Sequence, residues 1–243
     1  DFCFKQFMSK RVLFDLDGTL LPMDQEEFTK AYFGTLSATV APLGYEPKAL
    51  IQAIWSGTKS MVMNDGSTTN EEAFWCEFEK VFGSKVREDI PYFNAYYGKE
   101  FQQVKSSCGY QPLTSQLITL FEGKEKPILA TNPIFPHQAT YSRVQWAGLQ
   151  KEDFEYITTY ENSTHCKPNP EYYKDIIEHC HLDPSQCLMV GNDTSEDIAA
   201  LKTGMQVYIV TDTLVDTQHV DLTDIPHGTF EEMIAYVKEF LQN

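Results

Sequence analysis

The sequence has few positively charged residues, no long apolar run and no closely spaced pair of cysteines. It carries 19 lysines and arginines against 35 aspartates and glutamates, which gives a formal net charge of −16 at pH 7. Nucleic acids and anionic membranes both bind basic surfaces, so we expect neither as a partner. No apolar run approaches the length of a membrane span, and residues 1–10 are too mixed in polarity for a secretory signal.

Six cysteines are scattered among 243 residues without a Cys-x-x-Cys pair. A chain of this length, with 42% hydrophobic residues, can build a core without disulfides. We therefore expect reduced thiols in a cytoplasmic protein. Met8 would serve as the natural start, with the seven residues before it as an extension.

The segment 12–21, VLFDLDGTLL, combines a buried strand with acidic residues at its end. Side chains two apart in an extended chain project to the same side, so Asp15 and Asp17 can face one reaction centre. Gly18 permits the sharp turn that follows. Two neighbouring carboxylates repel each other, and Mg²⁺ commonly relieves such a pair. The alternative is a turn that the two aspartates only cap and solvate.

Residues 22–110 predict helices, with no convincing strand between them. Thr69 and Glu72 predict a capping box before one of these helices. Trp55 and Trp75 are expected in the core that the helices form. The segment therefore predicts a small all-α helical bundle. Apolar stripes with helical spacing occur at residues 28–40, 50–55, 74–82 and 90–104.

From residue 111 the pattern alternates between helices and short apolar strands, which is typical of βαβ units and a parallel sheet. The helical segment interrupts the first crossover, so we expect it to be an insertion in one α/β domain. The predicted architecture is a Rossmann-like, parallel five-stranded core sheet with helices on both faces (1–21 and 111–243) and an inserted helical bundle (22–110). The strands are expected at residues 12–16, 127–131, 154–158, 187–190 and 207–210.

Ligands of open parallel sheets bind at the carboxyl ends of the strands, so polar residues there are candidate site residues. Thr131 and Asn132 follow the second strand, where a hydroxyl and backbone N–H groups can hold phosphate oxygens. Lys167 follows the third strand, and nearby prolines stiffen the loop that carries its ammonium. An ordinary turn and a solvated lysine would explain the same residues.

Asp193 and Asp197 lie four residues apart after the fourth strand, in GNDTSED. One can bind a metal ion while the other braces it from behind. Capping of the helix that follows is the alternative explanation. That alternative does not explain why acidic residues collect at this strand end.

The motifs DLDGT, ATN, KPNP and GNDTSED, in this order, resemble those of the haloacid dehalogenase superfamily of phosphatases and phosphotransferases. The helical insertion after the first motif is similar to the cap of the branch that includes phosphoglycolate phosphatases and β-phosphoglucomutases. Asn192 is a departure, because many relatives have aspartate directly after the glycine. Asp193 thereby becomes the expected metal ligand.

The resemblance implies a role for each motif. Asp15 would be the nucleophile that forms an aspartyl-phosphate, and Asp17 would be the acid and base for the leaving group and water. Mg²⁺ would be bound by the Asp15 carboxylate, the Asp17 backbone carbonyl and Asp193. Asp197 would be a further ligand or a brace. The phosphate would be held by Asp15, Gly18, Thr131, Asn132 and Lys167, of which Thr131 and Lys167 also serve the chemistry.

The expected function is Mg²⁺-dependent hydrolysis of a small phosphorylated metabolite, by a monomer or a homodimer. Within the superfamily Asp17 argues against dehalogenation, because a departing halide needs no proton. A mutase and a phosphonate-cleaving relative are alternatives, and a catalytically inactive binding protein is a third. The loop 63–69 is a candidate cap contact, although its many turn-forming residues need no functional explanation. The phosphonate-cleaving alternative requires a Schiff-base lysine such as Lys30, Lys48 or Lys59.

Overall fold

A parallel sheet organises the part of the chain that carries the motifs. The computed structural model describes residues 9–243, so Met8, Cys3 and the expected extension lie outside the described residues. Within that range the strands are β1 (Arg11–Phe14), β2 (Ile128–Leu129), β3 (Tyr156–Ile157), β4 (Cys187–Gly191), β5 (Gln206–Val210) and β6 (His227–Gly228).

The strand order is β3-β2-β1-β4-β5-β6, and every neighbouring pair is parallel. The expected parallel α/β fold is confirmed, but the sheet of the described residues has six strands where the sequence predicts five. The additional strand, β6, is two residues long. A strand of that length is too short to leave an apolar or alternating pattern in the sequence.

β1 shows why its stretch of sequence is almost wholly apolar. Val12 and Phe14 enter one hydrophobic cluster, and Leu13 enters a second cluster on the opposite face. All three residues are at most 1% exposed. A central strand of a parallel sheet is covered on both faces, so it needs apolar side chains at successive positions.

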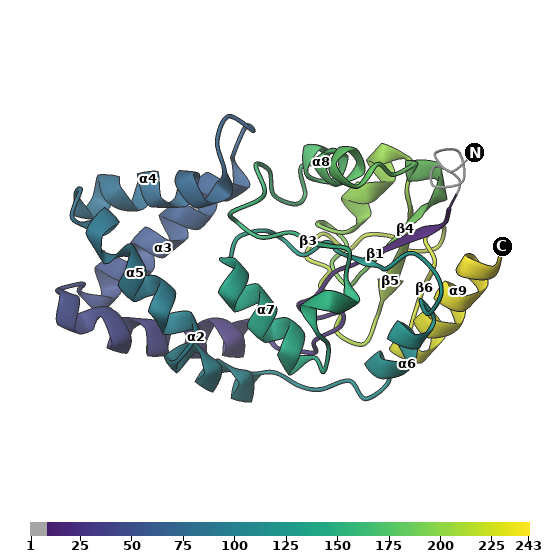
Figure 1. The fold of residues 1–243 in the computed structure, drawn as a ribbon, viewed down its shortest axis with the longest axis horizontal. Coiled ribbons are helices and arrows are strands. Elements are labelled where there is room, and N and C mark those ends of the chain that lie inside the picture. The colour runs from purple at the N-terminus through teal and green to yellow at the C-terminus, as the bar shows by residue number, and fades with distance from the viewer. Residues whose placement is uncertain (1–8) are drawn as a thin grey trace.

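Helices cover both faces of the sheet (Figure 1), as predicted. They are α6 (Thr114–Thr119), α7 (His137–Trp146), α8 (Pro170–Cys180), α9 (Phe230–Gln242) and the 3₁₀ helices η3 (Lys151–Asp153), η4 (Pro184–Gln186) and η5 (Ile198–Thr203). α6, α7 and α9 contribute to the cluster that contains Phe14. α8 and η5 contribute to the cluster that contains Leu13.

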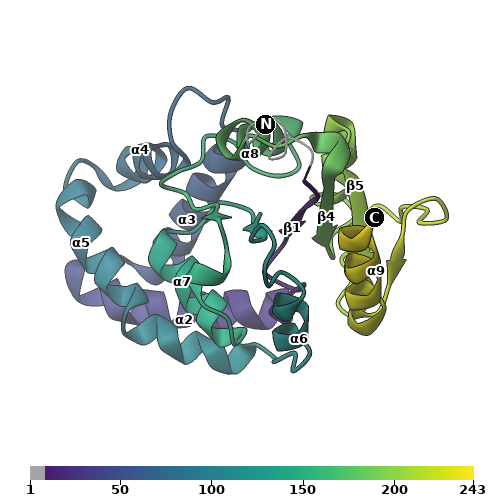
Figure 2. The ribbon, with the colours of Figure 1, turned by 45° about the vertical axis from the view of Figure 1, so that its right-hand side comes forward.

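Helices also form the segment between β1 and β2. They are α2 (Gln25–Val40), η1 (Ala41–Leu43), α3 (Pro47–Val62), α4 (Asn70–Phe82), α5 (Val86–Tyr97) and η2 (Glu100–Ser107). Figure 1 shows α2, α3, α4 and α5 gathered at one end of the molecule, with the strands at the other end. α7 lies between them, and the arrangement is the same in the turned view of Figure 2.

Two details of this bundle differ from the expectation. The stripe at residues 90–104 is not one helix, because Lys99, with φ −130° and ψ −89°, leaves the helical region. The capping box is half formed. Thr69 accepts the backbone N–H of Glu72 at 3.1 Å, but the Glu72 carboxylate binds Arg87 at 2.8 Å. The ion pair thus takes the carboxylate that a complete box requires.

The two tryptophans of the bundle have different environments. Trp75 is 4% exposed, as expected of a core residue, whereas Trp55 is 54% exposed and meets Phe33 edge-to-face, with ring centroids 5.4 Å apart. The expected core position of Trp55 is therefore wrong. Trp55 follows the buried Ile54 by one residue, and one helical residue turns a side chain by about 100°.

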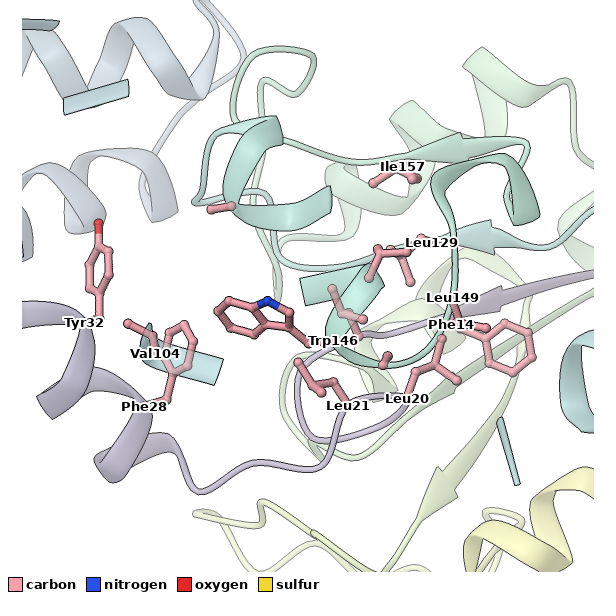
Figure 3. Close-up of a cluster of buried hydrophobic side chains, with 14 of the residues drawn as sticks. Phe14, Leu20, Leu21, Phe28, Tyr32, Val104, Leu129, Trp146, Leu149 and Ile157 are labelled. Carbon is pink, nitrogen blue, oxygen red and sulfur yellow. The ribbon is translucent and has the colours of Figure 1, made fainter. Parts of the chain in front are cut away.

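The bundle and the sheet are joined through adjacent connections and a shared core. Gly109 donates its N–H to the carbonyl oxygen of Pro22 at 2.7 Å, so the chain leaves and rejoins the sheet region at one place. Figure 3 shows that the shared cluster includes Phe14 of β1, Trp146 of α7 and Tyr32 of α2. Packing of the bundle is thus coupled to packing of the sheet.

Neither disulfides nor membrane-spanning helices occur in the part of the chain that the structure describes. The five cysteines of that part have free thiols. No helix among residues 9–243 is long and apolar enough to cross a lipid bilayer.

Replacing Leu13 by alanine tests the cluster beneath α8. Leu13→Ala should lower the free energy of unfolding by about 2–5 kcal/mol, because the side chain is fully buried and its removal leaves a cavity. Leu201→Ala is the matched control, since Leu201 is 43% exposed. Its effect should stay below about 1 kcal/mol. Denaturant titrations followed by circular dichroism measure both variants, and equal losses would contradict the prediction.

Candidate active site

Asp15 lies where β1 ends, at the carboxyl edge of the sheet. Its backbone N–H donates to the carbonyl oxygen of Val190 in β4 at 2.9 Å. Its Oδ1 accepts a hydrogen bond from Nζ of Lys167 at 3.1 Å, and its Oδ2 lies 3.4 Å from the hydroxyl of Thr19. Burial raises the pKa of Asp15 well above its usual value, although the Lys167 ammonium opposes that shift.

The turn after β1 depends on Gly18, whose φ is +83°. A Cβ at this position would lie 2.3 Å from Nδ2 of Asn192. Asn192 donates from Nδ2 to the carbonyl oxygen of Thr213 at 2.9 Å, and its Oδ1 accepts the Thr19 hydroxyl at 3.1 Å. An amide supplies both the donor and the acceptor, which an aspartate cannot do. Asn192 therefore links the β1 turn to the loop that carries Thr213.

Lys167 joins the first and fourth motifs. Its Nζ lies 3.1 Å from Oδ1 of Asp15 and 2.7 Å from Oδ1 of Asp197, and the residue is 1% exposed. Burial alone would lower the pKa of Lys167, but the two carboxylates outweigh burial and hold the pKa well above its usual value. Oδ2 of Asp197 accepts the N–H groups of Asn192 and Asp193, each at 3.0 Å. Both oxygens of Asp197 thus accept hydrogen bonds inside the protein. This favours a role in positioning Lys167 and the loop at residues 192–193 over a role as a metal ligand.

Thr131 and Asn132 follow β2 at the same edge of the sheet. The carbonyl oxygen of Thr131 accepts the hydroxyl of Tyr172 at 2.8 Å. Oδ1 of Asn132 accepts the backbone N–H of Lys167 at 3.1 Å, and Nδ2 donates to Oε1 of Glu196 at 3.0 Å. Asn132 therefore ties the third motif to the fourth.

Asp193 and Glu196 bring further negative charge to this edge. Oδ1 of Asp193 accepts the N–H groups of Ser195 and Glu196, at 2.8 and 2.9 Å. Burial raises the pKa of Asp193, and burial together with nearby carboxylates raises the pKa of Glu196 to about 7. Burial, the main cause of both shifts, disfavours the charged form of each acid, and a nearby cation would favour it. Glu196 was not predicted from the sequence, because it fits the helix-capping pattern of an ordinary first-turn acid.

A cavity of about 270 Å³ collects most of these side chains. The α2 helix contributes Gln25 and Phe28 to its wall, so the helical bundle covers part of it. Gly18 and Lys167, which are both buried, are not among its lining residues. The lining at the strand ends is Asp15, Asp17, Thr131, Asn132, Asn192, Asp193 and Glu196.

A larger groove, of about 540 Å³, runs beside β3 and α8. None of the acids in the four motifs lines it. Volume alone therefore does not identify the site, and the convergence of strand-end side chains does.

Arg143 is a further residue that the sequence analysis missed. It lies in α7, and its Nε donates to Oδ1 of Asp17 at 2.9 Å. An arginine inside a helix of mixed polarity gives no sign of such a contact, because most arginines are solvated. Only the packing of α7 brings the guanidinium to Asp17.

The bundle contacts the motif loops through Asn70, the first residue of α4. Its Nδ2 donates to the carbonyl oxygens of Pro133 and His165, at 3.1 and 3.2 Å, and the residue is fully buried. Asn64 supports it, donating from Nδ2 to Oδ1 of Asn70 at 2.8 Å. The turn-forming residues of the loop 63–69 are enough to explain it as a simple connection. Its Asn64 nevertheless supports the contact between Asn70 and the segment before the third motif.

The donors of the cavity suit a hard divalent cation. Mg²⁺ is commonly bound by one or two carboxylates together with water and substrate oxygens, and Asp15 and Asp193 both line the cavity. Within residues 9–243, no three His, Cys, Asp or Glu side chains are gathered as a complete metal site. A cation here would accordingly need backbone, water or substrate oxygens besides the carboxylates.

The comparison with protein families gives the class of this protein. The family described as haloacid dehalogenase-like hydrolase matches residues 12–210, which include all four motifs. The chain therefore belongs to the haloacid dehalogenase-like hydrolases, and the resemblance seen in the motifs is confirmed. Among curated proteins, the candidate phosphatase YhcW of Bacillus subtilis (strain 168) is 33% identical over 66 residues. That segment spans 27% of this chain and 30% of YhcW, so most of the relative's own length is not covered.

Solved structures share the fold over nearly the whole chain. A 2-haloacid dehalogenase from Pseudomonas syringae pv. Tomato DC3000 has a TM-score of 0.63 at 18% identity, covering 97% of this chain and 99% of that one. A HAD phosphatase from Thermococcus onnurineus has a TM-score of 0.56 at 18% identity, covering 94% and 97%. The candidate HAD-hydrolase YfnB from Bacillus subtilis, bound to magnesium, has a TM-score of 0.53 at 16% identity, covering 94% and 98%. These similarities show the fold, which a dehalogenase and a phosphatase have in common.

Glu196→Gln tests the crowding of acids in the cavity. Because the pKa of Glu196 is raised from 4.5 to about 7, its contribution to stability is complete below about pH 4.5 and is lost as the pH rises through about 7. In the presence of a chelator, raising the pH from about 5 to about 8 should therefore lower the thermal stability of the wild type more than that of Glu196→Gln. Glu239→Gln, which removes an exposed acid, should keep the wild-type pH dependence. Identical melting curves for wild type and Glu196→Gln at both pH values would contradict the prediction.

Proposed function

We propose that this chain is a Mg²⁺-dependent phosphatase that hydrolyses a small phosphorylated metabolite through an aspartyl-phosphate intermediate. The proposal rests on the pair Asp15 and Asp17, which line the same cavity. Lys167 donates a hydrogen bond to the carboxylate of Asp15. An alkoxide leaving group needs a proton, whereas a halide does not. An acid two residues after the nucleophile therefore supports phosphoryl transfer over dehalogenation.

The proposed mechanism uses the two aspartates in turn. An oxygen of Asp15 bonds to phosphorus as the bond to the leaving oxygen breaks, and Asp17 gives a proton to that oxygen. Asp17 then takes a proton from water, whose oxygen bonds to phosphorus as the bond to Asp15 breaks. Lys167 and Thr131 would stabilise the charge on the phosphate oxygens that are not transferred.

The residues present fit a magnesium ion. The carboxylates of Asp15 and Asp193 and the backbone carbonyl of Asp17 would hold it. Burial raises the pKa of both carboxyl groups, although Lys167 opposes both shifts, and a bound cation would favour their charged forms. When bound, the ion would supply positive charge that shields the substrate phosphate from these acids.

We also propose that residues 22–110 are a cap on a core formed by residues 1–21 and 111–243. Gln25 and Phe28 on the cap side line the cavity that contains Asp15 and Asp17. A helical cap over the site excludes bulk water and limits access, which favours small substrates.

The lysines required by a phosphonate-cleaving reaction lie elsewhere. Lys30, Lys48 and Lys59 are exposed, and none of them lines the cavity. A Schiff-base lysine has to reach the substrate carbonyl, so these positions do not favour that reaction.

Hydrolysis of an aryl phosphate is the first measurement. The wild type should release phosphate with Mg²⁺ and stop when a chelator is added. Asp15→Asn should lower kcat by about 10³-fold or more, because an amide does not replace a carboxylate nucleophile. Asp221→Asn, at an exposed position, should match the wild type.

Two results would contradict the proposal. A wild type that hydrolyses neither aryl phosphates nor a panel of small phosphate esters would rule out the phosphatase. An active Asp15→Asn variant would rule out the aspartyl-phosphate.

Asp17→Asn separates proton transfer from binding. We expect kcat/KM for an alkyl phosphate to fall by about 10²–10⁴-fold, because a positioned acid-base group typically contributes that factor. With a good leaving group the phosphorylated enzyme should accumulate, and acid quenching followed by mass spectrometry would detect it on Asp15. A variant that turns over at the wild-type rate would show that Asp17 is not the acid-base group.

A further inference from the structure

We propose that Arg143 is the positioning residue of Asp17, whose carboxyl group it holds by one oxygen so that the other faces the substrate. The inference rests on the proposed function, because Asp17 carries out the proton transfers described above. In the proposed mechanism Arg143 touches neither the substrate nor the phosphate and acts through Asp17.

The contact joins elements that are far apart in the sequence. Nε of Arg143 donates to Oδ1 of Asp17 at 2.9 Å, across 126 positions of the chain. The Arg143 side chain is 0% exposed, whereas the Asp17 side chain is 23% exposed and lines the cavity. The guanidinium therefore reaches Asp17 from inside the protein and leaves the cavity side of the carboxyl group free.

The remaining donors of Arg143 distinguish this contact from an ordinary structural ion pair. Nη1 and Nη2 are buried and have no hydrogen-bond partner in the described part of the chain. The guanidinium lies over the ring of Phe135, 4.6 Å from its centroid, and Phe135 lines the same cavity as Asp17. A buried guanidinium with so few partners destabilises a fold relative to an apolar side chain of similar size. Stability alone therefore does not account for an arginine here, and orientation of Asp17 does.

The geometry also points to the oxygen of Asp17 that exchanges the proton. Oδ1 accepts the Nε–H of Arg143, so in the proposed mechanism Oδ2 is the oxygen that gives and takes the proton. In the first step the Oδ2–H bond breaks as the leaving oxygen takes the proton. In the second step Oδ2 takes a proton from water, and Oδ1 stays bonded to Arg143 throughout.

The test compares substrates with poor and good leaving groups, using kcat/KM, which reports formation of the aspartyl-phosphate. Arg143→Met should lower kcat/KM by about 10²-fold for an alkyl phosphate and by only about threefold for para-nitrophenyl phosphate. The nitrophenolate leaves without a proton, so the position of Asp17 matters little to it. Arg143→Lys keeps a positive charge and should restore part of the alkyl phosphate activity.

Arg87→Met is the matched control. Arg87 pairs with Glu72 and Glu79 on the helical bundle and does not line the cavity. The control variant should match the wild type with both substrates. It thereby separates the effect of removing any ion-paired arginine from the effect of removing Arg143.

The Asp17→Asn background supplies a second readout. If Arg143 acts through Asp17, adding Arg143→Met to Asp17→Asn should change kcat/KM by less than about twofold. A further loss as large as in the wild-type background would overturn the proposal, and so would equal losses with both substrates. Where thermal unfolding shows that Arg143→Met does not fold, Arg143→Lys is carried through the same comparisons. A wild type that hydrolyses neither ester would overturn the proposed function itself, before any Arg143 variant is compared.

Discussion

The buried ion pairs of Lys167 are the constraint on which the site depends. Its Nζ contacts Asp15, which follows β1, and Asp197, which precedes η5. The ends of two strands and the loop after β3 must therefore meet at one point. Removing one partner of such a set leaves the other charges buried without compensation, which is strongly unfavourable. The strand order, with β1 between β2 and β4, allows both neighbours of β1 to deliver side chains to that point.

The net charge of the protein repels a phosphate ester, whereas in the proposed mechanism Lys167 and a bound cation attract it at contact. The net charge of −16 repels an anion at long range, and Asp193 and Glu196 add to that repulsion inside the cavity. Salt screens charges beyond about 8–10 Å, so the distant acids matter less than those at contact. Attraction depends on Lys167 and on a cation held by the cavity acids in the proposed mechanism. Selection of the substrate is thus decided at contact and not during the approach.

Parallel strands allow part of the site to be predicted from sequence position. The end of each apolar run marks the carboxyl edge of the sheet, and Asp15, Thr131 and Asp193 all line the cavity there. Contacts that depend on helix packing could not be predicted in this way. The burial of Arg143 follows from the position of α7 between the sheet and the bundle, which no local pattern encodes. For the same reason a stripe of apolar residues did not show that Trp55 would be exposed.

The two aspartates of the first motif show how surroundings can give the same side chain two uses. Lys167 approaches Asp15 at 3.1 Å from the loop after β3, and Arg143 approaches Asp17 at 2.9 Å from α7. An ammonium is a compact charge whose donors can be shared, so Lys167 contacts both Asp15 and Asp197 and, in the proposed mechanism, a phosphate oxygen as well. A guanidinium forms directional bonds and holds a carboxyl group in one orientation. In the proposed mechanism Lys167 suits Asp15, a nucleophile whose bonds change during the reaction. Arg143 suits Asp17, an acid-base group that must keep the same orientation in both steps. In that mechanism, neighbouring carboxyl groups take different roles because different elements of the fold supply their partners.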